Sequence, residues 1–293
     1  MSSSQPDRKA RRFPLQLDQV ATLKSSGPKA ASAAQAGARE LLRPQAHLQQ
    51  IEQDRKRHST PQGVGLDSVQ VRRRMVERLM MDGISHTQVL DAFARVPRHL
   101  FVDSALVNQA YEDTSLPIGL GQTISKPSVV AAMIQSLCVR PGAAQAGAAH
   151  GKPLGHCLEI GTGCGYQAAL LGHLSRRVVS IERLCDLHVK ARANLDSMRQ
   201  HLPGWPDVRL VYGDGMIGHA PLAPYDTIIA AAGGSALPQA WIDQLAPGGR
   251  LVAPLEESRG TQVLTILDRL PDGSLQHSRA GAVLFVPLKS GTT

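Results

Sequence analysis

The spacing of apolar residues predicts that ordered structure begins near residue 67. Apolar side chains recur at helical spacing over residues 67–82, and Gly83 is a typical residue just beyond a helix end. A second helix should follow, with Ser85 as its N-cap and Pro97 at its end. We therefore expect N-terminal helices ahead of any strand.

Further along the chain, short apolar runs alternate with segments of helical spacing. The runs expected to form strands are residues 157–160, 178–182, 208–214, 226–232, 249–255, 261–270 and 282–288. The segments expected to form helices between them are residues 166–174, 185–199 and 238–245. Such alternation is typical of an α/β fold with a doubly wound, mostly parallel sheet, and the turn sequence at 271–274 predicts an antiparallel edge.

The first 66 residues differ from the rest in composition. They are rich in serine, alanine and glycine, then polar and interrupted by proline, so they bury too little apolar surface to offset the entropy of ordering. We expect a disordered, basic, low-complexity tail over residues 1–66 and one folded domain over residues 67–293. Within that domain, the small residues of segment 141–155 predict a flexible surface insertion.

The distribution of charge argues against a nucleic-acid partner for the folded part. The formal net charge is +8, but residues 1–80 carry 15 Lys and Arg against 7 Asp and Glu. Residues 81–293 carry 17 of each sign and have no net charge. Aromatic residues make up only 3% of the chain, which leaves little material for stacking on bases.

Other compositional signals predict a cytoplasmic protein without a metal site. No apolar run approaches the roughly 20 residues that a membrane-spanning helix needs, and the N-terminus lacks an apolar signal core. None of the histidines forms a metal-binding motif. The cysteines have no CxxC spacing, so we expect buried, reduced thiols at Cys138, Cys157, Cys164 and Cys185.

Three glycines at alternate positions, Gly161, Gly163 and Gly165, directly follow the strand predicted at 157–160. At the carboxyl end of a parallel strand, glycine lets the backbone turn sharply and approach a ligand. A dinucleotide fingerprint would need another glycine at the position of Tyr166, and the chain has no GKS or GKT sequence for a phosphate loop. A tight strand-to-helix turn without a ligand is the alternative interpretation.

Two acidic residues at the ends of the next two strands narrow the choice of ligand. Glu182 is placed to accept hydrogen bonds from both hydroxyls of a ribose, and Asp214 from an adenine amino group. A nucleoside held by an acid at each end, with no phosphate site between, describes S-adenosylmethionine. As plain alternatives, Glu182 is a solvated charge and Asp214 a turn-forming residue. The residues predicted to bind S-adenosylmethionine are Glu159, Gly161, Thr162, Gly163, Gly165, Glu182, Asp214 and Gly215.

Five segments resemble the protein-L-isoaspartate O-methyltransferase family, in sequence and in order. They are "VPRHLFVD" at 96–103, "LPIGLGQTISKP" at 116–127, "LEIGTGCGYQAALL" at 158–171, "GDG" at 213–215 and "FVPL" at 285–288. The glycine-containing segment is shared by all class I methyltransferases, whereas the second segment is far more specific to this family. The resemblance runs from about residue 70 to the C-terminus.

The resemblance implies a class I, Rossmann-like fold and a protein repair reaction. A methyl group would pass from S-adenosylmethionine to the free α-carboxylate of an L-isoaspartyl residue. The ester would then close to a succinimide, and its hydrolysis would return part of the material to aspartate. Such a transfer needs no general base, because a carboxylate is already ionised at about pH 7 and a sulfonium is already an activated methyl donor.

The resemblance also implies roles for single residues. The implied catalytic residue is Ser125, and the implied substrate-binding residues are Ile118, Gln122 and Thr123. The expected partners are isoaspartyl proteins and peptides, and the expected state is a monomer. Ser125 has a structural interpretation as well, because it stands before Lys126-Pro127 like the N-cap of a helix over residues 127–137. The two interpretations are compatible, since a hydroxyl at a helix N-terminus is well placed to hold a carboxylate.

Three features depart from the family pattern: the N-terminal tail, the length of segment 141–155, and "AAAGG" at 230–234 in place of a threonine-containing run. The last of these bears on contacts to the substrate backbone. Two other functions stay open: a class I methyltransferase of RNA or a small molecule, with the tail as an RNA-binding arm, and a catalytically inactive nucleoside-binding module. The uncharged main body argues against the first, and the intact glycine, acid and serine positions argue against the second.

Overall fold

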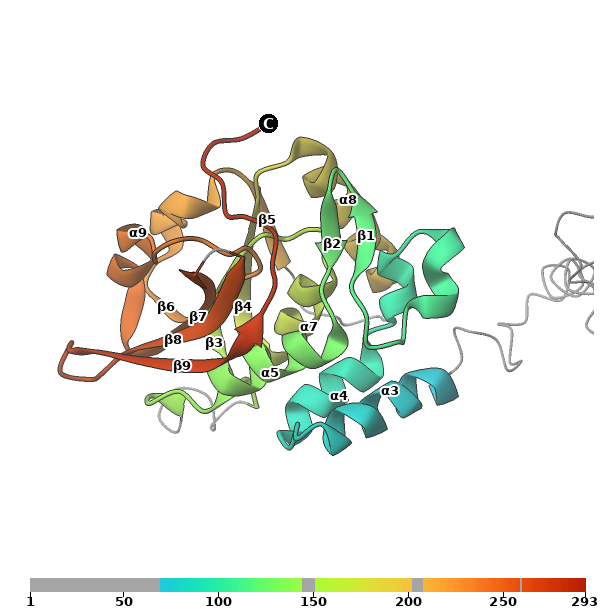
Figure 1. The fold of residues 1–293 in the computed structure, drawn as a ribbon, viewed down its shortest axis with the longest axis horizontal. Helices are drawn as coiled ribbons and strands as arrows, with labels where there is room; N and C mark the ends of the chain where they lie inside the picture. Colours follow the sequence, from blue (N-terminus) through green and yellow to red (C-terminus); the bar gives the residue numbers. More distant parts are fainter. Residues whose placement is uncertain (1–68, 144–150, 202–207, 259) are drawn as a thin grey trace, which may run out of the picture. The chain divides into compact units, whose positions relative to one another are not determined.

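The computed structural model describes residues 69–143, 151–201, 208–258 and 260–293. The predicted tail and the central part of the predicted insertion, residues 144–150, lie outside the described residues. Within the described part, a central sheet carries helices on both faces (Figure 1).

The sheet has seven strands in the order β5-β4-β3-β6-β7-β8-β9. Their bounds are β3 Gly155–Ile160, β4 Ser175–Glu182, β5 Val208–Tyr212, β6 Tyr225–Ala230, β7 Leu245–Ser258, β8 Thr261–Arg269 and β9 Leu275–Val283. Neighbouring strands from β5 to β7 are parallel, and β8 and β9 add an antiparallel edge. The predicted doubly wound, mostly parallel sheet with an antiparallel edge is confirmed. The strand order reverses at β3, and in such sheets ligands bind at the carboxyl end of that position.

The helices lie in two layers. They are α3 Val69–Met81, α4 Thr87–Arg95, α5 Pro127–Cys138, α7 Tyr166–Leu174, α8 Cys185–His201 and α9 Gln239–Asp243. Short 3₁₀ turns occur at η1 Arg98–Phe101, η2 Ser104–Gln109, η4 Gly215–Ile217 and η5 Ala220–Leu222. One hydrophobic core joins α4, α5, α7 and α8 to one face of the sheet, and a second core joins α9 to the other face through Trp241. The predicted N-terminal helices, α3 and α4, are confirmed.

A separate two-stranded antiparallel sheet precedes α5 and consists of β1 Leu116–Gly119 and β2 Gln122–Ile124. We call residues 116–124 the hairpin (Figure 1). Lys190 of α8 donates from Nζ to the Ile118 carbonyl at 3.0 Å, which holds the hairpin against α8. Buried residues of α8 and of the first turn of α7 belong to the same hydrophobic core. The hairpin is held against α8, so it lies beside the loop that joins β3 to α7.

The predicted N-cap of α4 is wrong. His86 is the N-cap, and its side chain makes no capping hydrogen bond. The backbone N–H groups of Ser85 and His86 instead donate to Gln135 Oε1, at 2.7 and 2.9 Å. A side chain from α5 thus accepts the backbone hydrogen bonds at the start of this helix, and the local sequence does not predict such a distant partner.

The predicted N-cap of α5 is wrong for a similar reason. Lys126 is the N-cap, and Asp113 accepts hydrogen bonds from the backbone N–H and the hydroxyl of Ser128, at 2.8 and 2.7 Å. Asp113 therefore caps the first turn of α5 from outside the helix. The Ser125 hydroxyl is left available for another role.

The last strand is placed differently from the prediction of residues 282–288. β9 begins directly after the predicted turn, and all of its residues except the last are exposed, so no apolar alternation marks it. Residues 284–293, here called the C-terminal segment, leave the sheet edge and return to the end of β6. There Gly233 donates to the Val286 carbonyl at 2.8 Å and accepts from the Leu288 N–H at 2.7 Å.

Two smaller predictions are also corrected. Leu154 is buried and Gly155 opens β3, so the surface insertion is narrower than residues 141–155. Cys185 is exposed at the start of α8, whereas the other three cysteines are buried as expected and all four are free thiols. The absence of CxxC spacing bears on the redox state of a cysteine, and it does not determine whether the first residue of a helix is buried.

Candidate active site

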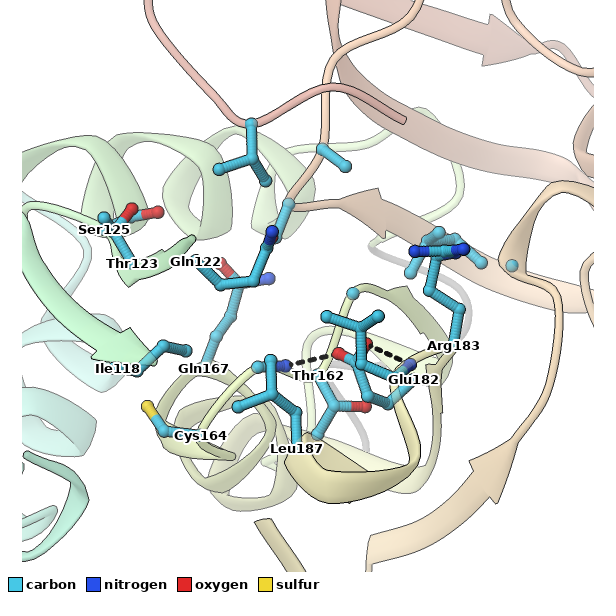
Figure 2. Close-up of a pocket in the computed structure, with 18 of the residues that line it drawn as sticks. Ile118, Gln122, Thr123, Ser125, Thr162, Cys164, Gln167, Glu182, Arg183 and Leu187 are labelled. Atoms are coloured by element: carbon cyan, nitrogen blue, oxygen red, sulfur yellow. Dashed lines mark hydrogen bonds between the residues drawn. The ribbon is translucent and has the colours of Figure 1, made fainter. Parts of the chain in front are cut away.

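A cavity of about 430 Å³ lies at the carboxyl ends of β3 and β4 (Figure 2). Much of its lining comes from four parts of the chain: the glycine loop at residues 161–164, the end of β4 with residues 183–184, the hairpin with Ser125, and residues 286–289 of the C-terminal segment. Figure 2 shows Ser125 and Thr123 on one side of this space and Glu182 and Arg183 on the other. The cavity thus has two walls of different origin.

The glycine loop presents bare backbone to the cavity. Gly161, Gly163 and Gly165 have φ angles of 87°, 57° and 91°, in the left-handed region that other residues rarely adopt. A Cβ atom added at Gly163 would lie 3.2 Å from Ile118 Cδ1, so a side chain there would collide with the hairpin. Gly161 and Gly163 line the cavity, as predicted for a loop that approaches a ligand.

Glu182 is held rigidly at the end of β4. Its Oε2 accepts from the Gly163 N–H at 2.8 Å, and its Oε1 accepts from the Leu184 N–H at 3.0 Å (Figure 2). The residue is only 5% exposed, yet it lines the cavity. Each oxygen keeps an acceptor site, so this carboxylate can still take hydrogen bonds from two neighbouring hydroxyl groups of a ligand.

Glu159 lies behind the glycine loop rather than in the cavity wall. It is fully buried, and it accepts a hydrogen bond from Ser180 on the neighbouring strand. The Ser180 hydroxyl is in turn 2.5 Å from Thr162 Oγ1, and Thr162 lines the cavity. Burial raises the pKa of Glu159 to about 8, and the hydrogen bond from Ser180 opposes this rise. Glu159 therefore acts on the cavity through Ser180 and the loop.

Two other predicted residues also lie outside the cavity wall. Asp214 Oδ1 accepts from the Met216 N–H at 2.8 Å, and Oδ2 accepts from the Gly291 N–H at 2.7 Å. Its carboxylate thus joins the η4 turn to the C-terminal segment, while the adjacent Gly215 lines the cavity. A Cβ atom at Gly165 would come within 3.4 Å of the Ala191 carbonyl oxygen of α8, so this glycine permits close packing of loop and helix.

The four residues to which the resemblance assigns a catalytic or substrate-binding role lie together in the cavity wall. Ile118, Gln122 and Thr123 of the hairpin line the cavity with Ser125, which follows β2 directly. Ser125 is half-buried, and its hydroxyl has no hydrogen-bond partner among the described residues. It therefore remains free to bind a ligand that enters the cavity.

Part of the cavity wall is formed by residues that the sequence did not predict individually. The cavity-lining residues without a prediction at the single-residue level include Leu120, Tyr166, Gln167, Arg183, Leu184, Leu187, Ala231, Ala232, Pro287, Leu288 and Lys289. Two of these come from the unusual "AAAGG" run and three from the end of the "FVPL" segment and the residue after it. "FVPL" was one of the family motifs and "AAAGG" was a departure from the family pattern, but the spacing of residues did not place either segment at the cavity.

The described residues contain no group of three or more His, Cys, Asp or Glu side chains that could hold a metal ion. Among the helices of the described ranges, none is long and apolar enough to cross a membrane.

The fold and the cavity together define a class of protein. A sheet of this strand order, with a glycine loop after β3 and an acid at the end of β4 in one cavity, is that of a class I, S-adenosylmethionine-dependent methyltransferase. Residues 70–293 match the family described as protein-L-isoaspartate(D-aspartate) O-methyltransferase (PCMT). The chain belongs to this family.

Curated relatives agree with the family match. A protein-L-isoaspartate O-methyltransferase of Methylibium petroleiphilum is 57% identical over 294 residues, which cover 100% of both chains. One of Leptothrix cholodnii is 55% identical over 100% of this chain and 98% of its own. Both alignments include the N-terminal residues, so the tail is not peculiar to this chain.

Two solved structures are similar in fold. A protein-L-isoaspartate O-methyltransferase structure has a TM-score of 0.62 at 26% identity, covering 75% of this chain and 66% of its own. A Plasmodium falciparum structure, described as a protein-L-isoaspartate O-methyltransferase in complex with S-adenosyl-L-homocysteine, has a TM-score of 0.59 at 26% identity. It covers 74% of this chain and 97% of its own.

Proposed function

We propose that the protein transfers a methyl group from S-adenosylmethionine to the free α-carboxylate of L-isoaspartyl residues in damaged proteins and peptides. The observation that carries the proposal is a cavity with two walls. The donor wall holds the glycine loop and Glu182, and the acceptor wall holds the hairpin and Ser125, whose hydroxyl has no hydrogen-bond partner in the described ranges. The family and the names of the relatives supply the substrate class. The methyl ester then closes to a succinimide without help from the enzyme, and hydrolysis returns part of it to L-aspartate.

The donor wall fits S-adenosylmethionine. The positive φ angles at Gly161 and Gly163 keep side chains out of the space that the ligand needs, and Glu182 retains two acceptor sites for ribose hydroxyls. Thr162 and Gly215 complete this wall. When bound, S-adenosylmethionine supplies a methyl group that its sulfonium already activates.

Three predicted donor-side residues support this wall from behind. Glu159 holds Thr162 through Ser180, Gly165 lets the loop pack on α8, and Asp214 fixes the turn that carries Gly215. Their contribution to donor binding is therefore indirect: they orient the backbone that the donor contacts.

The acceptor wall fits a carboxylate. Ser125 and Thr123 offer hydroxyl donors just before the N-terminus of α5, where the aligned peptide dipoles favour an anion. Gln122 can add an amide donor, and Ile118 gives an apolar floor between the two walls. Because the carboxylate is ionised at about pH 7, these residues need only orient it and exclude water. No residue is needed as a general base.

The family match favours this function over methylation of RNA or a small molecule. A catalytically inactive nucleoside-binding module would require a defect in one of the two walls, and both walls are intact in their glycine, acid and serine positions. That the protein acts as a monomer in the cytoplasm stays a prediction.

The test is radiolabelled methyl transfer to three peptides of one sequence: the isoaspartyl form, its aspartyl twin and the isoaspartyl form with an α-carboxamide. We expect label on the first peptide alone, and release of that label as the ester closes. Equal labelling of the aspartyl twin, or no labelling of any peptide by protein that binds S-adenosylhomocysteine, would refute the proposal.

A further inference from the structure

Arg98, at the start of η1, is an arginine without a carboxylate partner in the protein interior. Its relative exposure is 0%, and none of the described acidic residues forms an ion pair with it. Removing a charged group from water without pairing it is strongly unfavourable, because the group loses its hydration. Burial lowers the pKa of Arg98, and nearby Tyr166 and Asp113 oppose this. An arginine nevertheless stays protonated near neutral pH.

Arg98 contacts two residues that line the cavity, Ser125 and Tyr166. Nη2 donates to the Ser125 carbonyl at 2.8 Å and points toward the Thr114 carbonyl at 3.4 Å. The guanidinium carbon lies 4.8 Å from the centre of the Tyr166 ring, a cation–π contact. Ser125 and Tyr166 both line the cavity, one in the acceptor wall and one directly after the glycine loop.

The remaining nitrogens of Arg98 are not engaged. Nε and Nη1 have no hydrogen-bond partner among the described residues. None of the described acids forms a direct ion pair with this side chain, and the Asp113 carboxylate acts on it only at longer range. Since electric fields are screened weakly in a protein interior, such a charge raises the potential of the neighbouring cavity wall.

A second buried arginine shows that this arrangement is not general in the protein. Arg140 is 3% exposed, but its Nη2 lies 3.7 Å from Asp226 Oδ1 at the start of β6. The start of β6 is the amino end of the strand, whereas the cavity is at the carboxyl ends of β3 and β4. The interior arginine remote from the cavity has a carboxylate partner, and the one behind the cavity does not.

We propose that Arg98 is a positioning residue for the methyl acceptor, which fixes the Ser125 backbone and places a positive charge behind the part of the cavity that receives the isoaspartyl α-carboxylate. This inference rests on the proposed function and names what selects an ionised acceptor. It assigns two separable roles to one side chain: a hydrogen bond that sets the loop, and a charge that favours an anion. Arg98 does not line the cavity, so it acts through Ser125 and through its field.

The two roles can be separated with two substitutions. Arg98→Lys keeps the charge and a hydrogen-bond donor, whereas Arg98→Gln keeps a donor without the charge, so the difference between them reports the charge. Arg140→Gln is the matched control, because it removes the charge of the other buried arginine at the opposite end of β6. Calorimetry on protein saturated with S-adenosylhomocysteine gives the Kd of the isoaspartyl peptide and of its α-carboxamide analogue without turnover.

We expect wild type, Arg98→Lys and Arg140→Gln to bind the carboxylate peptide more tightly than the carboxamide, and Arg98→Gln to lose about tenfold of that preference. The Kd of S-adenosylhomocysteine should be unchanged in all four proteins, which also shows that each is folded. Arg98→Gln with a wild-type preference for the carboxylate, or Arg98→Lys as defective as Arg98→Gln, would overturn the inference. Failure of wild type to methylate the isoaspartyl peptide would instead refute the proposed function, so the two failures are distinguishable.

Discussion

The two walls of the cavity are built in opposite ways. The donor wall consists mainly of backbone at the ends of adjacent strands, and its key carboxylate is locked by two backbone N–H groups. The acceptor wall consists of side chains on the hairpin and of Ser125, which follows it. We therefore expect donor affinity to depend on the shape of the backbone and on the single carboxylate of Glu182. We expect the choice of acceptor to depend on the side chains of the acceptor wall.

The comparison predicts that a substitution in the donor wall has the largest effect. Gly163→Val should abolish measurable binding of S-adenosylmethionine for two reasons. Its side chain would clash with Ile118, and a β-branched residue is strained at a φ of 57°. Calorimetry measures the affinity. Gly273→Val is the control, since Gly273 also has a positive φ of 86° but nothing lies within 4 Å of its Cβ position. Near-normal donor affinity in Gly163→Val would show that the cavity is not the donor site.

The acceptor wall should respond in turnover and not in donor affinity. Ser125→Ala is expected to lower kcat/KM for an isoaspartyl peptide about a hundredfold, because a misplaced acceptor loses that much in rate. Melting temperature should not change, because Ser125 is not the N-cap of α5. Ser128→Ala is the contrasting variant: it should lose stability through its bond to Asp113 while keeping its turnover. A Ser125→Ala enzyme with wild-type kinetics would remove this residue from the mechanism.

A smaller effect is expected for the acid at the end of β4. Glu182→Gln should weaken donor binding about tenfold. The new NH2 group would face a backbone N–H donor, of Gly163 or of Leu184, and the side chain would have one oxygen fewer to accept from a ribose hydroxyl. The variant should also lose discrimination against a 2′-deoxyribose analogue of the donor. Asp214→Asn should keep this discrimination, since the Asp214 carboxylate contacts Met216 and Gly291 instead. The same response in both variants would contradict the division between them.

The smallest effect concerns the acid behind the donor wall. Burial raises the pKa of Glu159 from 4.5 to about 8, so the folded protein holds this proton more tightly than the unfolded chain. The free energy of unfolding should therefore fall as pH rises between those two values, and Glu159→Gln should reduce the slope. Urea unfolding at several pH values measures it, with the exposed Glu77→Gln as control. An unchanged slope in Glu159→Gln would show that Glu159 is ionised throughout the range.

The spacing of apolar residues located the strands that carry the donor wall but not the hairpin that carries the acceptor residues, and the physical reason is locality. Buried runs such as 157–160 and 178–182 lie inside β3 and β4, because central parallel strands are apolar on both faces. The exposed strand β9 has no such pattern, and its position was predicted wrongly. Asp214 could not be placed because its partner Gly291 is 77 residues away.

The prediction of the two helix N-caps failed for the same reason. Ser85 and Ser125 have the residue type of an N-cap, but Gln135 and Asp113 provide the hydrogen bonds from other elements. Propensity describes what a residue can do when nothing else competes, and here tertiary partners compete successfully. The acceptor residues Ile118, Gln122 and Thr123 were identified only through a family motif, since a short hairpin has no distinctive spacing.

The pairing of Gly233 with Val286 and Leu288 has a consequence for the order in which the protein assembles. This contact joins the end of a central strand to a segment that follows every strand of the sheet in the chain, so it closes a long loop. Contacts between residues far apart in the sequence form after local contacts, because closing the long loop loses chain entropy before the contact contributes any favourable energy. The strands that carry the donor wall can pair while the sheet forms, but the turn that carries Gly215 is tied to Gly291, and residues 286–289 line the cavity. Both walls are therefore complete only after the C-terminal segment has docked on the folded sheet.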